Sequence, residues 1–332
     1  MPGKTLGSAL RLLAIALAAL LAIALGFVAR HRSAIELPEP GPAVRAGHAP
    51  ATALETVDRG VSVATRLRLN GRSASPTTAW LRVPRALDAD YEILLTYVGH
   101  KTEGRILDLI PERRDLVLMA MQYAAEYRRD TWREKIALPR TVSGAVRDTV
   151  AGGMLALAEL EHRGFELERL TVLGASVGCF FAVLHGAYDE AVPRVLVVHG
   201  GADIRRILES WYRSERRPWT GRLVGGLAYL FLDPYDSVHH VARIAPRDFT
   251  LIAARGDAYF PEPSARLLYD AARPPKALVW NEGAHVRSRR ADIIADLVTQ
   301  IDLYLDGRLE LDESEAADLP DQRSAPAASS AR

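Results

Sequence analysis

Residues 170–178 read LTVLGASVG and are the most informative stretch of the chain. The apolar run at 170–173 predicts a buried strand, and residues 177–187 predict the helix that follows it. Gly174 and Gly178 leave room for a tight strand-to-helix turn around Ser176. A serine hydroxyl is a weak nucleophile unless such a turn presents it to a base and to backbone N–H donors. We therefore predict Ser176 as a nucleophile; the alternative is an N-capping serine in an ordinary glycine-rich turn.

Strand-like and helix-like segments alternate along the rest of the chain. Further strands are predicted at 93–98, 116–121, 195–198, 249–253 and 277–280, and further helices at 142–160 and 291–305. Short apolar runs without polar alternation are typical of strands buried on both faces, as in a parallel sheet covered by helices. The predicted fold class is therefore α/β, with a mostly parallel central sheet and helices on both faces.

An antiparallel edge is predicted ahead of these strands. Residues 61–69 and 77–83 look like two strands, and Asn70-Gly71 supplies the positive φ angles that a tight turn between them needs.

Two loops after later strands carry residues that would complete the chemistry of a nucleophilic serine. Residues 255–261 read RGDAYFP and contain Asp257, and residues 281–285 read NEGAH and end in His285. With the serine motif, these loops make residues 61–305 resemble the α/β-hydrolase family, which carries serine, acid and histidine in that order. The resemblance implies that His285 takes the proton of Ser176 and that Asp257 orients the imidazole.

The resemblance also implies an oxyanion hole and leaves a second acid open. The backbone N–H of Val177 is one expected donor, and Gly99 or His100 is the other. Many relatives carry His-Gly at that place where this chain has Gly-His. Asp203, soon after the strand at 195–198, is the reserve acid, because some members of the fold place the acid one strand earlier.

An irregular segment at 201–246 lies where this family inserts a cap. It holds aromatic residues and many arginines, namely Trp211, Tyr212, Trp219, Tyr229, Phe231, Arg205, Arg206, Arg213, Arg216, Arg217 and Arg222. One interpretation is a helical lid with an apolar underside for an acyl chain and a basic rim near anionic lipid headgroups. The other is a pair of amphipathic helices with solvated arginines.

Composition excludes several classes of protein. The 332 residues include 42 Lys and Arg against 41 Asp and Glu, a formal net charge of +1 that gives no reason to expect nucleic acid as a partner. The single cysteine excludes an internal disulfide framework and a Cys-rich metal site. His239-His240 does not match a metal motif, and the Gly-Gly pairs lack the spacing of a nucleotide-binding loop. We expect no cofactor and no metal.

The amino terminus contains an uncharged apolar run at 12–29, LLAIALAALLAIALGFVA. At about 1.5 Å per residue, a helix of this length nearly spans a bilayer. We predict a single-pass transmembrane anchor that leaves the catalytic domain exported or periplasmic; the alternative is a cleaved signal sequence. The predicted organisation lists a short basic tail at 1–11, the anchor at 12–29, a flexible linker at 30–60, a catalytic domain at 61–310 and a disordered tail at 311–332.

The function expected from these patterns is a membrane-tethered serine hydrolase that cleaves a carboxylic ester or thioester through an acyl-enzyme on Ser176. Its substrate would be a small-molecule or lipid-like acyl compound. A peptidase or amidase with the same three residues is an open alternative, as is a catalytically silent member of the fold that binds a ligand.

Overall fold

The computed structural model describes residues 3–33, 35–72, 76–98, 104–123, 132–216, 218–286 and 290–310. Within them, one nine-stranded sheet has the order β1-β2-β3-β5-β4-β6-β7-β8-β9. Its strands are β1 (His48–Asp58), β2 (Ser62–Gly71), β3 (Thr77–Pro84), β4 (Glu92–Tyr97), β5 (Leu116–Met121), β6 (Leu170–Ala175), β7 (Arg194–Val198), β8 (Asp248–Gly256) and β9 (Lys276–Ala284). In this spatial order, the strands from β5 through β4 to β9 pair in parallel, and β1, β2 and β3 form an antiparallel extension.

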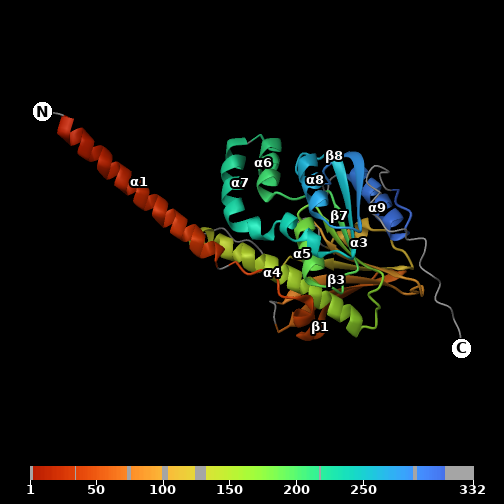
Figure 1. Cartoon of the computed structure of the whole chain (residues 1–332). Helices are drawn as coiled ribbons and strands as arrows, with labels where there is room; N and C mark the ends of the chain where they lie inside the picture. Colours follow the sequence, from red (N-terminus) through yellow and green to blue (C-terminus); the bar gives the residue numbers. More distant parts are fainter. Residues whose placement is uncertain are drawn as a thin grey trace.

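Helices cover both faces of the sheet (Figure 1). The larger core lies between the sheet and helices α4 (Trp132–His162), α5 (Gly178–Tyr188) and α8 (Glu262–Ala271). The smaller core lies on the opposite face, beneath α3 (Ile106–Leu109) and α9 (Ala291–Leu305). One apolar stripe of α9 is buried there, because residues three or four apart share a helix face: Ile293, Leu297, Ile301 and Leu305. The prediction of a mostly parallel α/β fold is confirmed.

Two details near the amino-terminal edge differ from the sequence predictions. Asn70 and Gly71 do not form the predicted turn; they are the last residues of β2 and pair with Ala49 and His48 of β1. Because β1 supplies partners along this edge, β2 extends through the Asn-Gly pair and the connection to β3 begins after it.

The segment at 30–60, predicted as a flexible linker, instead contains regular structure. It forms α2 (Gly41–Ala46) and the edge strand β1. Val44 is buried in the larger core, and Gly41 lies so close to Asp189 that a side chain would not fit. Ala- and Pro-rich composition hid these contacts, since they depend on partners far away in the sequence.

Two helices, α6 (Ile204–Ser214) and α7 (Pro218–Leu232), occupy the segment predicted as a cap. Three short 3-10 turns follow, namely η1 (Asp233–Tyr235), η2 (Ser237–His239) and η3 (Val241–Arg243). Arg205 and Arg206 form ion pairs with acidic residues of their own segment, and the Arg222 guanidinium lies 5.1 Å from the centre of the Trp219 ring. These three arginines therefore already interact with residues of their own segment.

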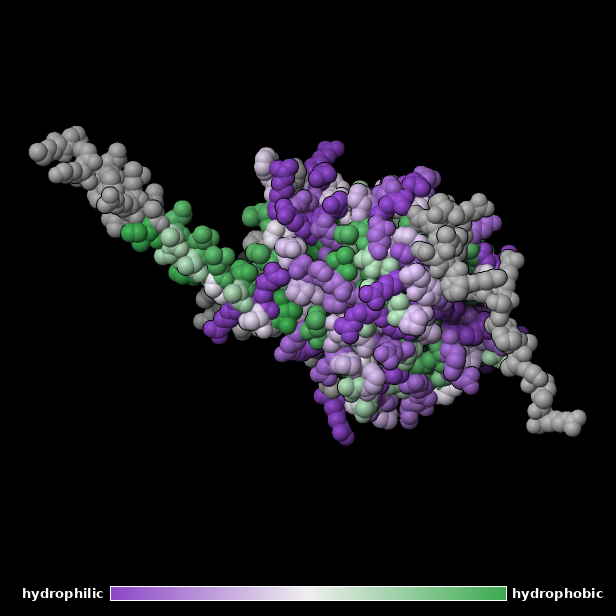
Figure 2. All heavy atoms as spheres, in the orientation of Figure 1, coloured by the Kyte–Doolittle hydropathy of each residue, from purple (hydrophilic) through white to green (hydrophobic). Residues whose placement is uncertain are grey.

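Helix α1 (Gly3–Arg32) projects away from the body of the molecule (Figure 1). It contacts α7 near its carboxyl end, where the Phe27 and Phe231 rings meet edge to face and Arg32 forms an ion pair with Asp233. Figure 2 shows apolar side chains along its described part. None of the helices that the structure describes combines the length and the apolar character needed to span a bilayer. The predicted anchor at 12–29 falls partly on side chains that are not described, and the predicted tail at 311–332 lies outside the described residues.

Candidate active site

Ser176 lies on a sharp turn between β6 and α5. It has a φ angle of +57°, which is uncommon for a residue with a side chain, and its N–H donates to the Val198 carbonyl at 3.0 Å. The flanking glycines are required by close packing. A Cβ on Gly178 would lie 2.0 Å from the Tyr97 carbonyl oxygen, and one on Gly174 would lie 2.6 Å from the Gly178 carbonyl oxygen. The turn therefore holds the serine at the carboxyl end of a central strand.

The structure brings His285 and Asp257 to this serine. Ser176 Oγ lies 2.9 Å from His285 Nε2, and His285 Nδ1 lies 2.6 Å from Asp257 Oδ2. An ionised carboxylate can only accept, so Nδ1 carries the hydrogen and Nε2 is left to accept from the serine hydroxyl. The three side chains thus form one directed chain of hydrogen bonds.

Backbone and ring contacts hold the acid and the base in place. The second carboxylate oxygen of Asp257 accepts from the N–H groups of Tyr259 and Phe260, both at 2.8 Å. The Phe260 ring stacks on the His285 imidazole with an interplanar angle of 15°, and the Tyr259 ring lies 4.8 Å from it. The sequence RGDAYFP therefore supplies the acid and also two walls for the imidazole.

Val177 is the expected oxyanion donor that the structure describes. It caps the amino terminus of α5 and is 41% exposed. The first N–H groups of a helix have no intrahelical partner, so the Val177 N–H is placed beside Ser176 and can donate to a bound ligand. Gly99 and His100, the candidates for the second donor, lie outside the described residues.

The reserve acid, Asp203, does not join the hydrogen-bonded chain. Its carboxylate accepts from the Arg206 N–H at 3.0 Å, which makes it the N-cap of α6, and it pairs with the Arg206 guanidinium. Asp257, and not Asp203, contacts the histidine.

Sequence reasoning missed His199 as a residue of this site. It directly follows β7, is 1% exposed and has a positive φ angle of 48°. Its Nδ1 accepts the N–H of Val286, the residue after His285, at 3.0 Å, and its Nε2 lies 3.2 Å from the Asn281 side-chain amide. Burial lowers the pKa of His199 to about 4, so the ring is neutral near pH 7. A polar residue at the carboxyl end of a buried strand was the available signal.

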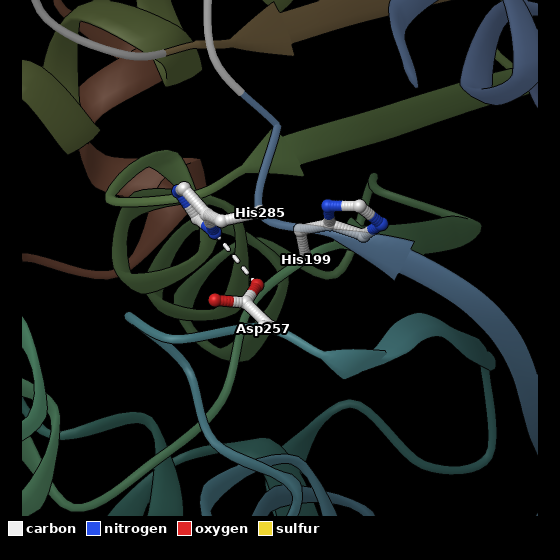
Figure 3. Close-up of side chains that lie close together, drawn as sticks. All are labelled: His199, Asp257 and His285. Carbon is white, nitrogen blue, oxygen red and sulfur yellow. Dashed lines mark hydrogen bonds and ion pairs between the residues drawn. The ribbon is translucent and has the colours of Figure 1, made fainter. Parts of the chain in front are cut away.

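One group of described side chains has donor atoms close enough to share a metal ion: His199, Asp257 and His285, within 4.8 Å of one another. Figure 3 shows the hydrogen bond between His285 and Asp257, with His199 beside them. A metal here would have to break that bond, and His199 Nδ1 already accepts from a backbone N–H. The arrangement therefore suits proton transfer better than metal binding. His239 and His240 form hydrogen bonds with separate partners, Asp233 and Pro234.

Two hollows border the hydrogen-bonded chain, one at Ser176 and the other at His285. The first is a cavity of about 140 Å³ between the sheet and helices α3 and α9. Of the described residues that line it, only Thr96 and Ser176 are polar; the others are Val98, Ile106, Leu109, Ile110, Leu173, Ala175, Val198, Val286, Ile294, Leu297, Val298 and Ile301. The second, of about 220 Å³, is lined by Gly256, Ala258, Tyr259, Ala284, His285 and Arg290.

The segment predicted as a cap contacts the acid loop. Ser210 of α6 donates to the Ala258 carbonyl at 3.0 Å, and Trp211 meets the Tyr259 ring edge to face. The Tyr259 hydroxyl donates to Glu215 at 3.1 Å. The Tyr259 ring also contacts His285, so the Tyr259 side chain links α6 to the site.

Solved structures resemble this arrangement, although no protein family and no curated protein matches the sequence. Acetyl xylan esterase 1 from Thermoanaerobacterium sp. JW/SL YS485 is 14% identical, with 81% of this chain and 95% of that chain covered and a TM-score of 0.55. The acetyl xylan esterase from Paenibacillus sp. R4 is 16% identical, with 80% and 96% covered and a TM-score of 0.54. At such low identity, the likeness establishes architecture alone. The chain has the α/β-hydrolase fold.

Proposed function

We propose that this protein is a serine hydrolase that cleaves a carboxylic ester or thioester through an acyl-enzyme on Ser176. The observation that carries the proposal is the continuous hydrogen-bonded chain from Ser176 through His285 to Asp257. The fold adds support, because the two similar structures named above are esterases by name.

The first half of the reaction forms the acyl-enzyme. Ser176 Oγ attacks the carbonyl carbon while its proton passes to His285 Nε2. Asp257 holds the imidazole and stabilises the imidazolium, and the Val177 N–H donates to the developing oxyanion. The tetrahedral intermediate then collapses, and Nε2 returns the proton to the departing alcohol or thiol.

The second half releases the acid. His285 takes a proton from water, the hydroxide attacks the acyl carbonyl, and the proton returns to Ser176 as the carboxylic acid leaves. Every proton in the cycle moves through His285 Nε2, and the reaction consumes one ester or thioester and one water molecule.

Two alternatives are less well supported. A peptidase or amidase would use the same proton transfers with an amine as leaving group, and the esterase neighbours are the reason to place it second. A silent binding protein would have no need for all three residue types at hydrogen-bonding distance.

The test is labelling of the full chain with a fluorophosphonate, which reacts with an activated serine without knowledge of the substrate. We expect labelling of the parent and its loss in Ser176→Ala and His285→Ala. His239→Ala is the matched control, because His239 is exposed and its described contacts are with Asp233 and His240, neither of which belongs to the hydrogen-bonded chain. A folded parent that resists labelling would contradict the proposal.

A further inference from the structure

We propose that the apolar cavity between the sheet and α9 is the acyl subsite, that it selects an apolar acyl group of about six carbon atoms, and that the leaving group lies on the Tyr259 side. This inference rests on the proposed function and deepens it, since neither the fold nor the names of similar structures assign an acyl group of this size.

The positions of the two hollows relative to the proton path determine which part of the substrate each one takes. The acyl carbon stays bonded to Ser176 through the intermediate, so the acyl group must extend into a space that Ser176 itself borders. The apolar cavity is lined by Ser176 and not by His285. The leaving group must receive its proton from His285, and the second hollow is lined by His285 and not by Ser176.

The size of the cavity limits the acyl group. Its volume is about 140 Å³. An engineered apolar cavity of about 150 Å³ in another protein holds one benzene molecule, which has six carbon atoms. A hexanoyl or similarly sized branched or aromatic acyl group therefore fits, an acetyl group leaves most of the space empty, and a decanoyl group exceeds it.

The described part of the lining disfavours polar acyl groups. Among the described residues of the wall, the only polar side chain apart from Ser176 is that of Thr96, whose hydroxyl already donates to the Met119 carbonyl. A charged or hydroxylated acyl group would lose its water there without gaining partners. The ligand class is therefore a saturated or aromatic hydrocarbon acyl group.

Helix α9 supplies one wall of the cavity, and substitutions in this helix can test the proposal. Four residues on one stripe line the cavity: Ile294, Leu297, Val298 and Ile301. Leu297 can be replaced with a larger or a smaller side chain: phenylalanine would fill part of the cavity, and alanine would enlarge it. Ala295 lies on the exposed side of the same helix, so Ala295→Phe is the matched control for an added ring.

The experiment measures kcat/KM of the full chain for p-nitrophenyl esters from acetyl to decanoyl. For the parent we expect about a fourfold rise for each methylene group that enters the cavity, a maximum near hexanoyl, and a fall of at least about tenfold by decanoyl. Leu297→Phe should move the maximum toward acetyl or propionyl, and Leu297→Ala should move it toward longer chains. Ala295→Phe should leave the profile unchanged. Ile301→Phe is a second filling variant should Leu297→Phe fail to fold.

Each outcome has a distinct meaning. A parent that prefers acetyl or decanoyl, or a maximum that neither Leu297 variant moves, would overturn the acyl subsite while leaving the hydrolase intact. A folded parent that hydrolyses none of the esters and is not labelled by fluorophosphonate would instead refute the proposed function.

Discussion

Asp257 accepts three hydrogen bonds, two from backbone N–H groups and one from His285. A side chain that replaces it must therefore offer an acceptor to each of these donors. An asparagine would present an amide N–H to the imidazole and favour the wrong tautomer. We predict that Asp257→Asn lowers kcat by about 10⁴-fold with little change in KM.

The control for that substitution is Asp203→Asn, measured with the same ester. Asp203 caps α6 and has no contact with His285 among the described interactions, so kcat should change by less than about threefold. A large loss in Asp203→Asn together with a small loss in Asp257→Asn would reverse the assignment of the acid.

We predict that His199 makes the free energy of unfolding depend on pH. Its folded pKa of about 4 lies below the ordinary value of 6.5, so the unfolded chain binds more protons between these two values. The stabilisation is therefore present above pH 6.5 and is lost as the pH falls toward 4, by up to about 3 kcal/mol.

The measurement is the free energy of unfolding from pH 7 to pH 4, compared between the parent and His199→Asn. Asparagine does not titrate, and its amide oxygen lies where Nδ1 does, so it can still accept the Val286 N–H. The parent should lose more stability than the variant over this range. Parallel curves would show that His199 is not held neutral in the folded state.

The catalytic candidates were predictable because each follows a recognisable strand in a loop with its own pattern. Ser176 has flanking glycines, Asp257 precedes an apolar-Pro ending, and His285 follows a glycine. His199 also follows a strand, yet nothing around it forms a motif, and its role depends on contacts with residues more than eighty positions away.

At the scale of single elements, the turn between β6 and α5 depends on Gly178. A Cβ at this position would lie 2.0 Å from a backbone oxygen of β4, and backbone cannot move aside cheaply. We predict that Gly178→Ala destabilises the fold by several kcal/mol, on the scale of severe overpacking, and reduces fluorophosphonate labelling.

Thermal unfolding measures this effect against Gly144→Ala in α4. Among the described residues, no atom outside its chain neighbours and the backbone of its own helix lies within 4 Å of a Cβ built on Gly144, so alanine there should leave stability unchanged or raise it by about 1 kcal/mol. Equal melting temperatures in the two variants would mean that the turn tolerates a side chain at Gly178.

Strands of the sheet could be predicted where buried residues form an apolar run in the sequence. They could not be predicted where a strand depends on pairing with a partner strand. The buried parallel strands appear as apolar runs, and α9 begins and ends where its apolar stripe does. The edge strand β1 is mostly exposed, so it has no apolar run, and only its pairing with β2 makes it a strand. The same pairing extends β2 through Asn70-Gly71, overriding the local preference for a turn.

On the scale of the whole molecule, the two faces of the sheet are packed differently. The face beneath α4, α5 and α8 carries the larger core, while the face beneath α3 and α9 carries the smaller core and the apolar cavity. Because Ser176 borders that cavity, we propose that the substrate binds on the face beneath α3 and α9.

Helix α1 carries apolar side chains that are exposed; Leu20 and Ile23, for example, are more than 60% exposed. Exposed apolar surface of this extent needs a partner, and we propose that the partner is a lipid bilayer. Replacing both residues with arginine should weaken insertion, since each charge at the centre of a membrane helix costs about 2.5–3.5 kcal/mol. We predict that the full chain remains in the membrane pellet after carbonate extraction, that Leu20→Arg/Ile23→Arg is released, and that Leu20→Ala/Ile23→Ala is retained. Release of an intact parent, verified by mass, would contradict the anchor, whereas release of a shortened parent would indicate a cleaved signal sequence.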